Sequence, residues 1–129
     1  MDELAKRRMD LAESRLLNAA DDIRLVHYDG AINRSYYAIF AAMRALLAQR
    51  NVEFKKHSAV MSYFHKEYIK TGIFEKKYSK YLQAAFEARN GFDYDDNLCV
   101  TAEDAEEQYA HAQEFVSEIR RYLEKEYGA

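Results

Sequence analysis

Apolar residues recur every three or four positions along most of this chain, which is the spacing of one face of an α-helix. Five segments show the pattern, at about residues 3–27, 31–50, 56–70, 74–91 and from 101 onward. Short stretches that contain glycine or several acidic residues separate them. The pattern therefore predicts an all-α fold, a bundle of about five helices.

The second segment carries apolar or small residues on two neighbouring sides. The stripe of large residues consists of Ile32, Tyr36, Phe40, Met43 and Leu47. The stripe of small residues consists of Ala31, Ser35, Ala38, Ala42 and Ala45. Small side chains let another backbone approach closely, so we expect this helix at the centre of the bundle.

The first and fifth segments have heptad-like spacing of their apolar residues, which predicts that they pack together as an antiparallel pair. The stretch from Thr101 to Asp104 has the capping-box pattern that begins a helix. We expect a short acidic loop just before it, at about residues 93–100.

Aromatic residues are abundant, with 11 tyrosines and 7 phenylalanines. Phe115 and Tyr122 lie beside the main apolar stripe of the fifth segment, and aromatic residues are enriched in interface cores. We therefore predict a homodimer. The alternative is that the aromatic side chains fill one irregular core within the chain.

Length and composition narrow the class of protein. The 129 residues fit a single helical domain spanning 1–129, and the absence of proline favours helices. One cysteine cannot form an internal disulfide, no apolar run is long enough to cross a bilayer, and the first residues lack the apolar stretch of a secretion signal. We expect a cytoplasmic location and no membrane partner.

Charge is distributed unevenly along the chain, although the net charge is only −3. Residues 50–80 contain eight basic against three acidic residues, a net charge of +5, whereas residues 81–129 have a net charge of −8. This asymmetry is compatible with phosphate binding on one face, with head-to-tail pairing of copies, or simply with solvated helix faces.

Motifs of the common enzyme classes are missing. The sequence has no glycine-rich phosphate loop, no Cys-x-x-Cys, no His-Glu-x-x-His and no Gly-x-Ser-x-Gly. Its four histidines lack the i, i+4 spacing of a local metal site. We expect neither a metal ion nor a cofactor.

Arg89 is the most informative residue, because it interrupts an apolar helix stripe. The other members of that stripe are Phe74, Tyr78, Leu82, Ala85 and Phe92. A guanidinium on such a face needs a carboxylate, a phosphate or a water-filled cleft beside it. Arginine binds phosphate through two parallel hydrogen bonds, and Arg34, near the small stripe of the second segment, is a further candidate. The alternative is that Arg89 pairs with a carboxylate such as Asp93 and only stabilises the bundle.

Three parts of the chain together resemble the HEPN domain family. They are residues 34–47, residues 55–65, and residues 68–72 with Arg89-Asn90 and Asp93-Tyr94. The resemblance implies an up-and-down bundle of four or five helices that dimerises, with arginines of both subunits facing a shared cleft. Small members of the family resemble one half of a two-gene, toxin–antitoxin-like module whose other half is a minimal nucleotidyltransferase.

Active members of that family resemble metal-independent endoribonucleases, whose signature is an Arg, a polar residue, and a His after four to six intervening residues. Arg89 and Asn90 match the first two positions, but Tyr94 stands at the first of the places open to the His. Tyrosine has an ordinary pKa near 10 and is poorly suited to proton transfer at neutral pH. His57, in a segment that also resembles the family, is the other candidate imidazole.

Three functions remain open at this point. The first is a nucleotide- or RNA-binding component that uses Arg89, Arg34, His57 and Asn90 in a dimer cleft, with a nucleotidyltransferase partner and no DNA. The second is an active endoribonuclease toxin whose catalytic residues are Arg89, Asn90 and Tyr94. The third is a purely structural dimer or scaffold. A further hypothesis is that the partner transfers a nucleotidyl group to Tyr94.

Overall fold

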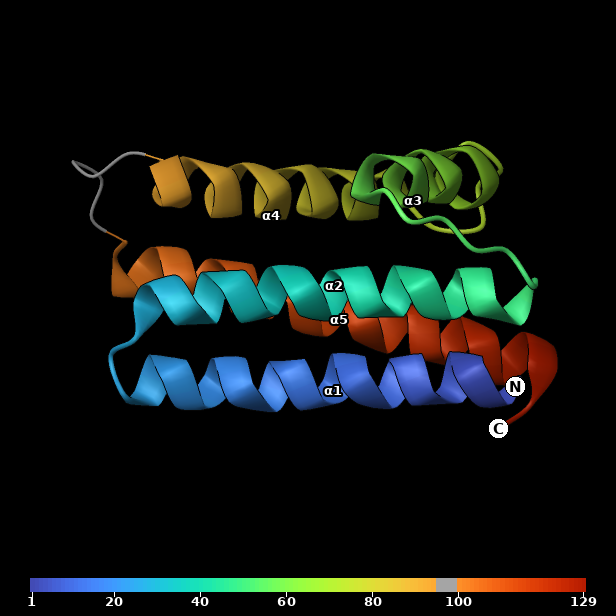
Figure 1. Cartoon of the computed structure of the whole chain (residues 1–129), viewed down its shortest axis with the longest axis horizontal. Coiled ribbons are helices and arrows are strands. Elements are labelled where there is room, and N and C mark those ends of the chain that lie inside the picture. Colours follow the sequence, from blue (N-terminus) through green and yellow to red (C-terminus); the bar gives the residue numbers. More distant parts are fainter. Residues whose placement is uncertain (95–99) are drawn as a thin grey trace.

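The computed structural model describes residues 1–94 and 100–129, apart from the side chains of residues 92–94. The helical elements in this part are α1 (Glu3–Arg24), α2 (Tyr28–Gln49), α3 (His57–Phe64), the π-helical turn η1 (His65–Ile69), α4 (Lys76–Tyr94) and α5 (Ala102–Tyr127). Their order gives an up-and-down arrangement in which α1 and α4 lie on opposite sides of α2 and α5 (Figure 1). The predicted all-α fold is confirmed. Within the described ranges, no helix is long and apolar enough to span a bilayer.

Helix α2 is the centre of the bundle, as predicted from its two stripes. It packs against α1, α3, α4 and α5. Every member of both its large and its small stripe is buried. The small stripe provides the close approach that lets α2 serve four neighbours at once.

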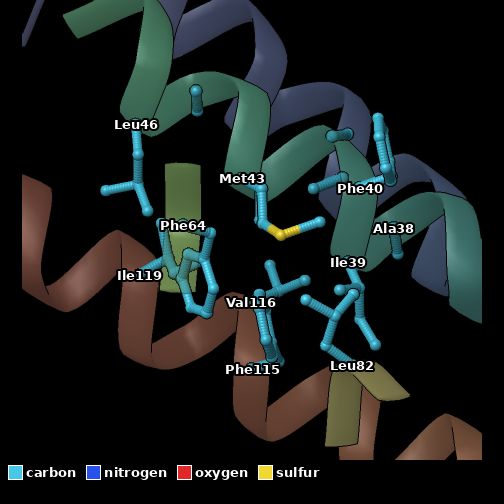
Figure 2. Close-up of a cluster of buried hydrophobic side chains, with 14 of the residues drawn as sticks. Ala38, Ile39, Phe40, Met43, Leu46, Phe64, Leu82, Phe115, Val116 and Ile119 are labelled. Atoms are coloured by element: carbon cyan, nitrogen blue, oxygen red, sulfur yellow. The ribbon is translucent and has the colours of Figure 1, made fainter. Parts of the chain in front are cut away.

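The main core is formed where α2 meets α3, α4 and α5. Met43 of α2 points toward Phe115 and Val116 of α5, and Phe64 of α3 and Leu82 of α4 enter the same cluster (Figure 2). All five are at most 4% exposed. This packing fixes the position of α4 against α2, and with it the position of Arg89.

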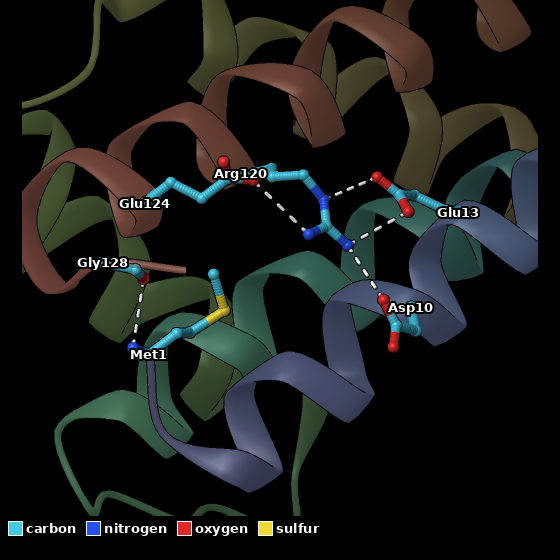
Figure 3. Close-up of polar contacts among 6 residues, drawn as sticks. All are labelled: Met1, Asp10, Glu13, Arg120, Glu124 and Gly128. Carbon is cyan, nitrogen blue, oxygen red and sulfur yellow. Dashed lines mark hydrogen bonds and ion pairs between the residues drawn. The ribbon is translucent and has the colours of Figure 1, made fainter.

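Helices α1 and α5 run antiparallel and are joined by a charged cluster, which agrees with the expected pairing. Arg120 of α5 lies 3.0 Å from Asp10 and 2.6 Å from Glu13 of α1, and 3.5 Å from Glu124 of its own helix (Figure 3). The amino group of Met1 donates to the carbonyl oxygen of Gly128 at 3.1 Å. Polar contacts therefore supplement the apolar stripes at this end.

The two aromatic residues that suggested a dimer contribute to the fold of the single chain. Phe115 is fully buried, with its ring 5.3 Å from that of Phe64 between centroids. Tyr122 is half-buried, and its ring centroid lies 5.2 Å from that of Phe74. Phe115 is thus part of the core of the single chain and does not mark a dimer surface, because the short α3–η1 segment packs against α5 through aromatic rings. The dimer itself remains a prediction.

The turn between α1 and α2 lies earlier than the sequence pattern indicates. Helix α1 ends at Arg24, and Val26 adopts the left-handed conformation with φ 64° and is exposed, so it does not continue the apolar stripe. Gly30 lies inside α2, where a Cβ atom would be 2.9 Å from Oδ2 of Asp22. This glycine therefore makes room for the ion pair between Asp22 and Arg34.

The third and fourth helices also differ from prediction at their ends. After α3 the chain widens into η1, in which the amide of Lys70 donates to the carbonyl of His65 at 2.9 Å. Helix α4 begins at Lys76 and continues through Gly91 to Tyr94, so residues 93 and 94 are helical rather than part of a loop. A single glycine costs a helix only about 1 kcal/mol, which is too little to end it.

Candidate phosphate-binding site

Arg89 lies near the C-terminal end of α4, on the side that faces α2. It follows the buried Leu82 and Ala85 on the same stripe, and its own side chain is half-buried. The packing that buries these apolar residues thus carries the guanidinium onto the first half of α2.

The guanidinium donates hydrogen bonds to three neutral groups. Its Nε donates to Oδ1 of Asn33 at 3.3 Å, and its terminal nitrogens donate to the Tyr37 hydroxyl at 3.2 Å and to Oδ1 of Asn90 at 3.4 Å. Its central carbon lies 5.2 Å from the ring centroid of Tyr36 and 5.3 Å from that of Tyr37, within the range of cation–π attraction. These contacts orient the fork of Arg89 and leave its positive charge in place.

Among the carboxylates whose side chains the structure describes, none lies within 4 Å of the Arg89 guanidinium. The suggested alternative partner, Asp93, lies outside the described side chains. An arginine positioned by amide and hydroxyl oxygens can still present donors to a phosphate, since these contacts do not offset its charge.

His57, the first residue of α3, belongs to the same site. Its Nδ1 lies 3.2 Å from the Tyr36 hydroxyl, and its ring centroid is 3.9 Å from that of Phe40. Tyr36 therefore contacts both His57 and Arg89. Desolvation of the ring, followed by the positive charges of Arg89 and Arg44, holds the pKa of His57 below its ordinary value. The lowered pKa favours the neutral form of the imidazole.

Arg34, the second predicted phosphate ligand, has a carboxylate partner. Its guanidinium lies 2.7 Å from Oδ2 of Asp22, whose side chain is only 14% exposed. The ion pair offsets much of the charge of Arg34, so Arg34 is less suited than Arg89 to bind an anion. It still lines the surface next to Arg89.

Two hollows meet around Tyr37. One, of about 300 Å³, is lined by Arg15, Asn33, Arg34 and Tyr37. The other, of about 170 Å³, has both apolar and basic lining, with these residues: Arg8, Leu11, Arg15, Tyr37, Phe40, Ala41, Arg44 and His57. Arg15 and Tyr37 line both, so the Arg89 contacts open onto a continuous basic surface of α1 and α2.

A carboxylate of the same chain, Glu53, neutralises part of that basic surface. Glu53 lies 2.9 Å from Arg8 and 2.6 Å from Arg44, and its hydrogen bonds to these arginines lower the pKa of its carboxyl group. Arg15 has no ion-pair partner among the described side chains. Arg15 and Arg89 thus contribute more to the positive charge of this surface than Arg8 and Arg44 do.

The sequence-predicted residues are only partly brought together. Arg89, Asn90 and His57 gather around Tyr36 and Tyr37, and Arg34 lies at the edge. The side chain of Tyr94 lies outside the described residues. Sequence reasoning missed Asn33 and Tyr37, although their i, i+4 spacing on one side of α2 was a usable signal.

The remaining histidines lie elsewhere. The ring of His111 stacks on Tyr81 at 4.0 Å, and Nδ1 of His65 is 3.4 Å from the Ser79 hydroxyl. In the described part of the chain, no group of three potential metal ligands comes together. His57 is the imidazole that shares a contact with Arg89.

Comparisons with known proteins identify the family of this chain. The model of the HEPN domain matches residues 5–122. A Methanocaldococcus jannaschii protein named "Putative toxin MJ0142" is 34% identical over 74% of this chain and 65% of its own length, slightly under two thirds. A second protein of that organism, named "Putative toxin MJ0605", is 31% identical over 91% of this chain and 87% of its own.

A bacterial relative extends the comparison. The "UPF0332 protein" of Thermotoga maritima is 32% identical over 85% of this chain and 86% of its own length. The family match covers α2, α3, η1 and α4 in full and all but the outer ends of α1 and α5, so it includes both helices that carry Arg89 and its partners. The chain therefore belongs to the HEPN domain family, to which its sequence motifs already pointed.

Proposed function

We propose that this chain binds the phosphate groups of a nucleotide or RNA through Arg89, in the cleft of a homodimer. In this proposal it is the binding component of a toxin–antitoxin-like module whose other component is a minimal nucleotidyltransferase. The names of the two archaeal relatives support the toxin setting. The dimer and the transferase rest on the family resemblance.

The observation that carries the proposal is that the hydrogen-bond partners of Arg89 among the described residues are neutral. Asn33, Tyr37 and Asn90 fix the fork through oxygen atoms that bear no formal charge. A phosphate would replace water at the outer edge of the guanidinium and gain charge-assisted hydrogen bonds. The ring faces of Tyr36 and Tyr37 hold the guanidinium in place, so little side-chain entropy remains to be lost on binding.

The absence of the signature histidine from the motif after Arg89 favours binding of RNA without its cleavage. The family signature requires a His where this chain has Tyr94. In cleavage of RNA, a base takes the proton of the ribose 2′-hydroxyl as its oxygen attacks the adjacent phosphorus, and an acid protonates the leaving 5′-oxygen. The ordinary pKa of tyrosine suits neither role at neutral pH.

One observation supports the second candidate, an active metal-independent endoribonuclease toxin that uses Arg89, Asn90 and Tyr94. His57, whose lowered pKa favours the neutral imidazole, lies beside Tyr36 within the same site as Arg89. An imidazole in this state is able to accept the proton from a 2′-hydroxyl, and Arg89 would stabilise the charge developing on phosphate.

Fluorescence anisotropy in EDTA tests the binding proposal, with a labelled single-stranded RNA 12-mer and a labelled ATP analogue as probes. Arg89→Ala should weaken binding of at least one probe by about 10- to 100-fold, since a charge-assisted pair contributes about 1.5–3 kcal/mol. Arg89→Lys should recover part of the loss. Arg121→Ala, an exposed change on α5, is the control. Unchanged binding in Arg89→Ala would refute the proposal.

Two further measurements address the remaining parts. Gel analysis of the same RNA should show no cleavage, and products that disappear in both Arg89→Ala and His57→Gln would favour the second candidate. Light scattering after size exclusion should give twice the chain mass of 15.1 kDa. Co-purification with the product of a neighbouring gene tests the transferase partner.

A further inference from the structure

A second basic hollow lies at the opposite end of the α3–α4 hairpin from Arg89. Two adjoining hollows of about 470 and 420 Å³ share His65, Lys70 and Ser79. The combined space, here called the lysine groove, runs between η1 and the first half of α4. Its basic lining residues are His65, Lys66, Lys70, Lys76 and Lys80.

Positive charge dominates this groove. Its lining includes four lysines and no carboxylate. None of the four lysines makes an ion pair with a described carboxylate, whereas the neighbouring Lys77 lies 2.5 Å from Glu114 and points to α5 instead. Four like charges around one hollow repel one another, so a bound anion would relieve that repulsion.

The floor and rim of the lysine groove have different chemistry. Leu82 and Met61 contribute apolar surface, and Ile69 does so at the end nearer Lys76. The Ser79 hydroxyl and Gln83 amide add hydrogen-bonding groups along α4. Lysines on the rim over an apolar floor suit a chain that carries phosphates on one side and bases on the other.

The groove and the Arg89 site lie at the two ends of the α3–α4 hairpin. The α3–η1 segment runs antiparallel to α4 (Figure 1), so His57 and Arg89 lie at one end and His65 and Ser79 at the other. Ten residues of helix separate Ser79 from Arg89, a rise of about 15 Å. That distance equals about four stacked nucleotides at 3.4 Å each.

We propose that the lysine groove binds the phosphate backbone of a single-stranded nucleic acid whose other end occupies the Arg89 site. The inference rests on the proposed function and adds to it a second anchor for the same strand. Lysine is a point charge without the planar fork of arginine, so this anchor tracks the backbone and does not read sequence. Arg89 and its tyrosines provide the oriented contact.

The test replaces Lys66, Lys70, Lys76 and Lys80 with glutamine in the full chain. Anisotropy is measured with a labelled 12-mer and a labelled trinucleotide of single-stranded RNA, each over a range of salt concentrations. The 12-mer should bind roughly tenfold more weakly, and its log–log salt slope should fall by about 3, since each phosphate contact contributes about 0.7. The trinucleotide, which fits at Arg89 alone, should bind as before.

A matched control separates the groove from net charge. Lys6→Gln, Arg24→Gln, Arg121→Gln and Lys125→Gln remove the same four charges from exposed positions of α1 and α5. An equal loss of 12-mer binding in this control would overturn the inference. Circular dichroism melting of both variants confirms that each is folded before binding is compared.

The outcomes distinguish this inference from the proposed function. If Arg89→Ala weakens binding and the quadruple lysine variant does not, the lysine groove is refuted and the function stands. If only the lysine variant weakens binding, the Arg89 function and the shared strand both fail.

Discussion

Arg89 and Arg120 each lie partly buried between two helices, but their neighbours differ in charge. Arg120 has three carboxylates within 3.5 Å, from Asp10, Glu13 and Glu124, and its side chain is 26% exposed. Arg89 is held by the amide and hydroxyl oxygens of Asn33, Tyr37 and Asn90. One arginine completes a charge cluster inside the fold, whereas the other is oriented by neutral groups. Stability and binding should therefore respond to different arginines.

The largest effect on stability is expected for Arg120→Ala. The change removes the cation that three carboxylates share, and they then repel one another between α1 and α5. We expect a loss of about 2 kcal/mol in the free energy of unfolding, measured in urea, with RNA binding unchanged. Arg121→Ala, next to it but paired only with Glu118 in the described residues, should cost less than about 0.5 kcal/mol. If Arg120→Ala costs no more unfolding free energy than Arg121→Ala, the stabilising role assigned to Arg120 is contradicted.

Arg89→Ala should cost less than about 1 kcal/mol of unfolding free energy, because its neutral partners remain accessible to water. The same urea titration measures it without ligand. A loss matching that of Arg120→Ala would contradict the assignment of Arg89 to binding and favour the structural alternative, in which a buried carboxylate is left without its partner.

Tyr37→Phe should have a smaller effect than the two arginine changes. It should weaken RNA binding and leave the unfolding free energy unchanged. The variant keeps the ring beside the Arg89 guanidinium and removes the hydroxyl that accepts its hydrogen bond at 3.2 Å. Binding of the RNA 12-mer should weaken about two- to fivefold, equivalent to about 0.5–1 kcal/mol. Tyr109→Phe, on α5, is the matched loss of a tyrosine hydroxyl. Equal effects of the two would show that Arg89 does not depend on this bond.

The smallest effect is a change in pH dependence caused by His57. Its pKa in the folded chain is lowered, so on acidification the unfolded chain takes up this proton first, near pH 6.5. The unfolded state then binds more protons, and stability falls as the pH is lowered below about 6.5. His57→Gln should make this fall shallower in urea titrations between pH 7 and pH 5. His27→Gln is the control, since it removes a histidine from another part of the chain. If stability falls more steeply with decreasing pH in His57→Gln than in the parent chain, the expected direction is wrong.

Much of the fold could be predicted because the spacing of buried apolar residues and local capping signals are visible in the sequence. The two stripes of α2 are buried as their spacing indicates. The Thr101–Asp104 capping box begins α5. Helix ends were less predictable, since Gly30 and Gly91 both lie inside helices and not at their ends.

The candidate site was predictable only where a residue breaks a pattern. Arg89 interrupts an apolar stripe and was found, but Asn33 and Tyr37 sit on a helix face where polar and aromatic residues are ordinary. Arg34 was chosen for its residue type, and its partner Asp22 comes from another helix. Asp22 and Arg34 are twelve positions apart, so their ion pair depends on where the chain turns between α1 and α2. The sequence pattern predicted this turn several residues further along the chain than the structure has it.

The π-helical turn η1 contains one residue more than an α-helical turn at the same place would contain. A π-helical turn closes over one residue more than an α-helical turn, so loss of one residue from 65–69 would convert it into regular helix. The helix on either side then keeps nearly the same faces, because a π-helical turn accommodates its extra residue locally and does not rotate the flanking helix by the 100° per residue of an α-helix. The extra residue thus lies in the wall of the lysine groove, in the turn that contains Lys66 and leads to Lys70. Among relatives, a single-residue gap at this place would mark a groove with an α-helical wall, whose flanking side chains face as they do here.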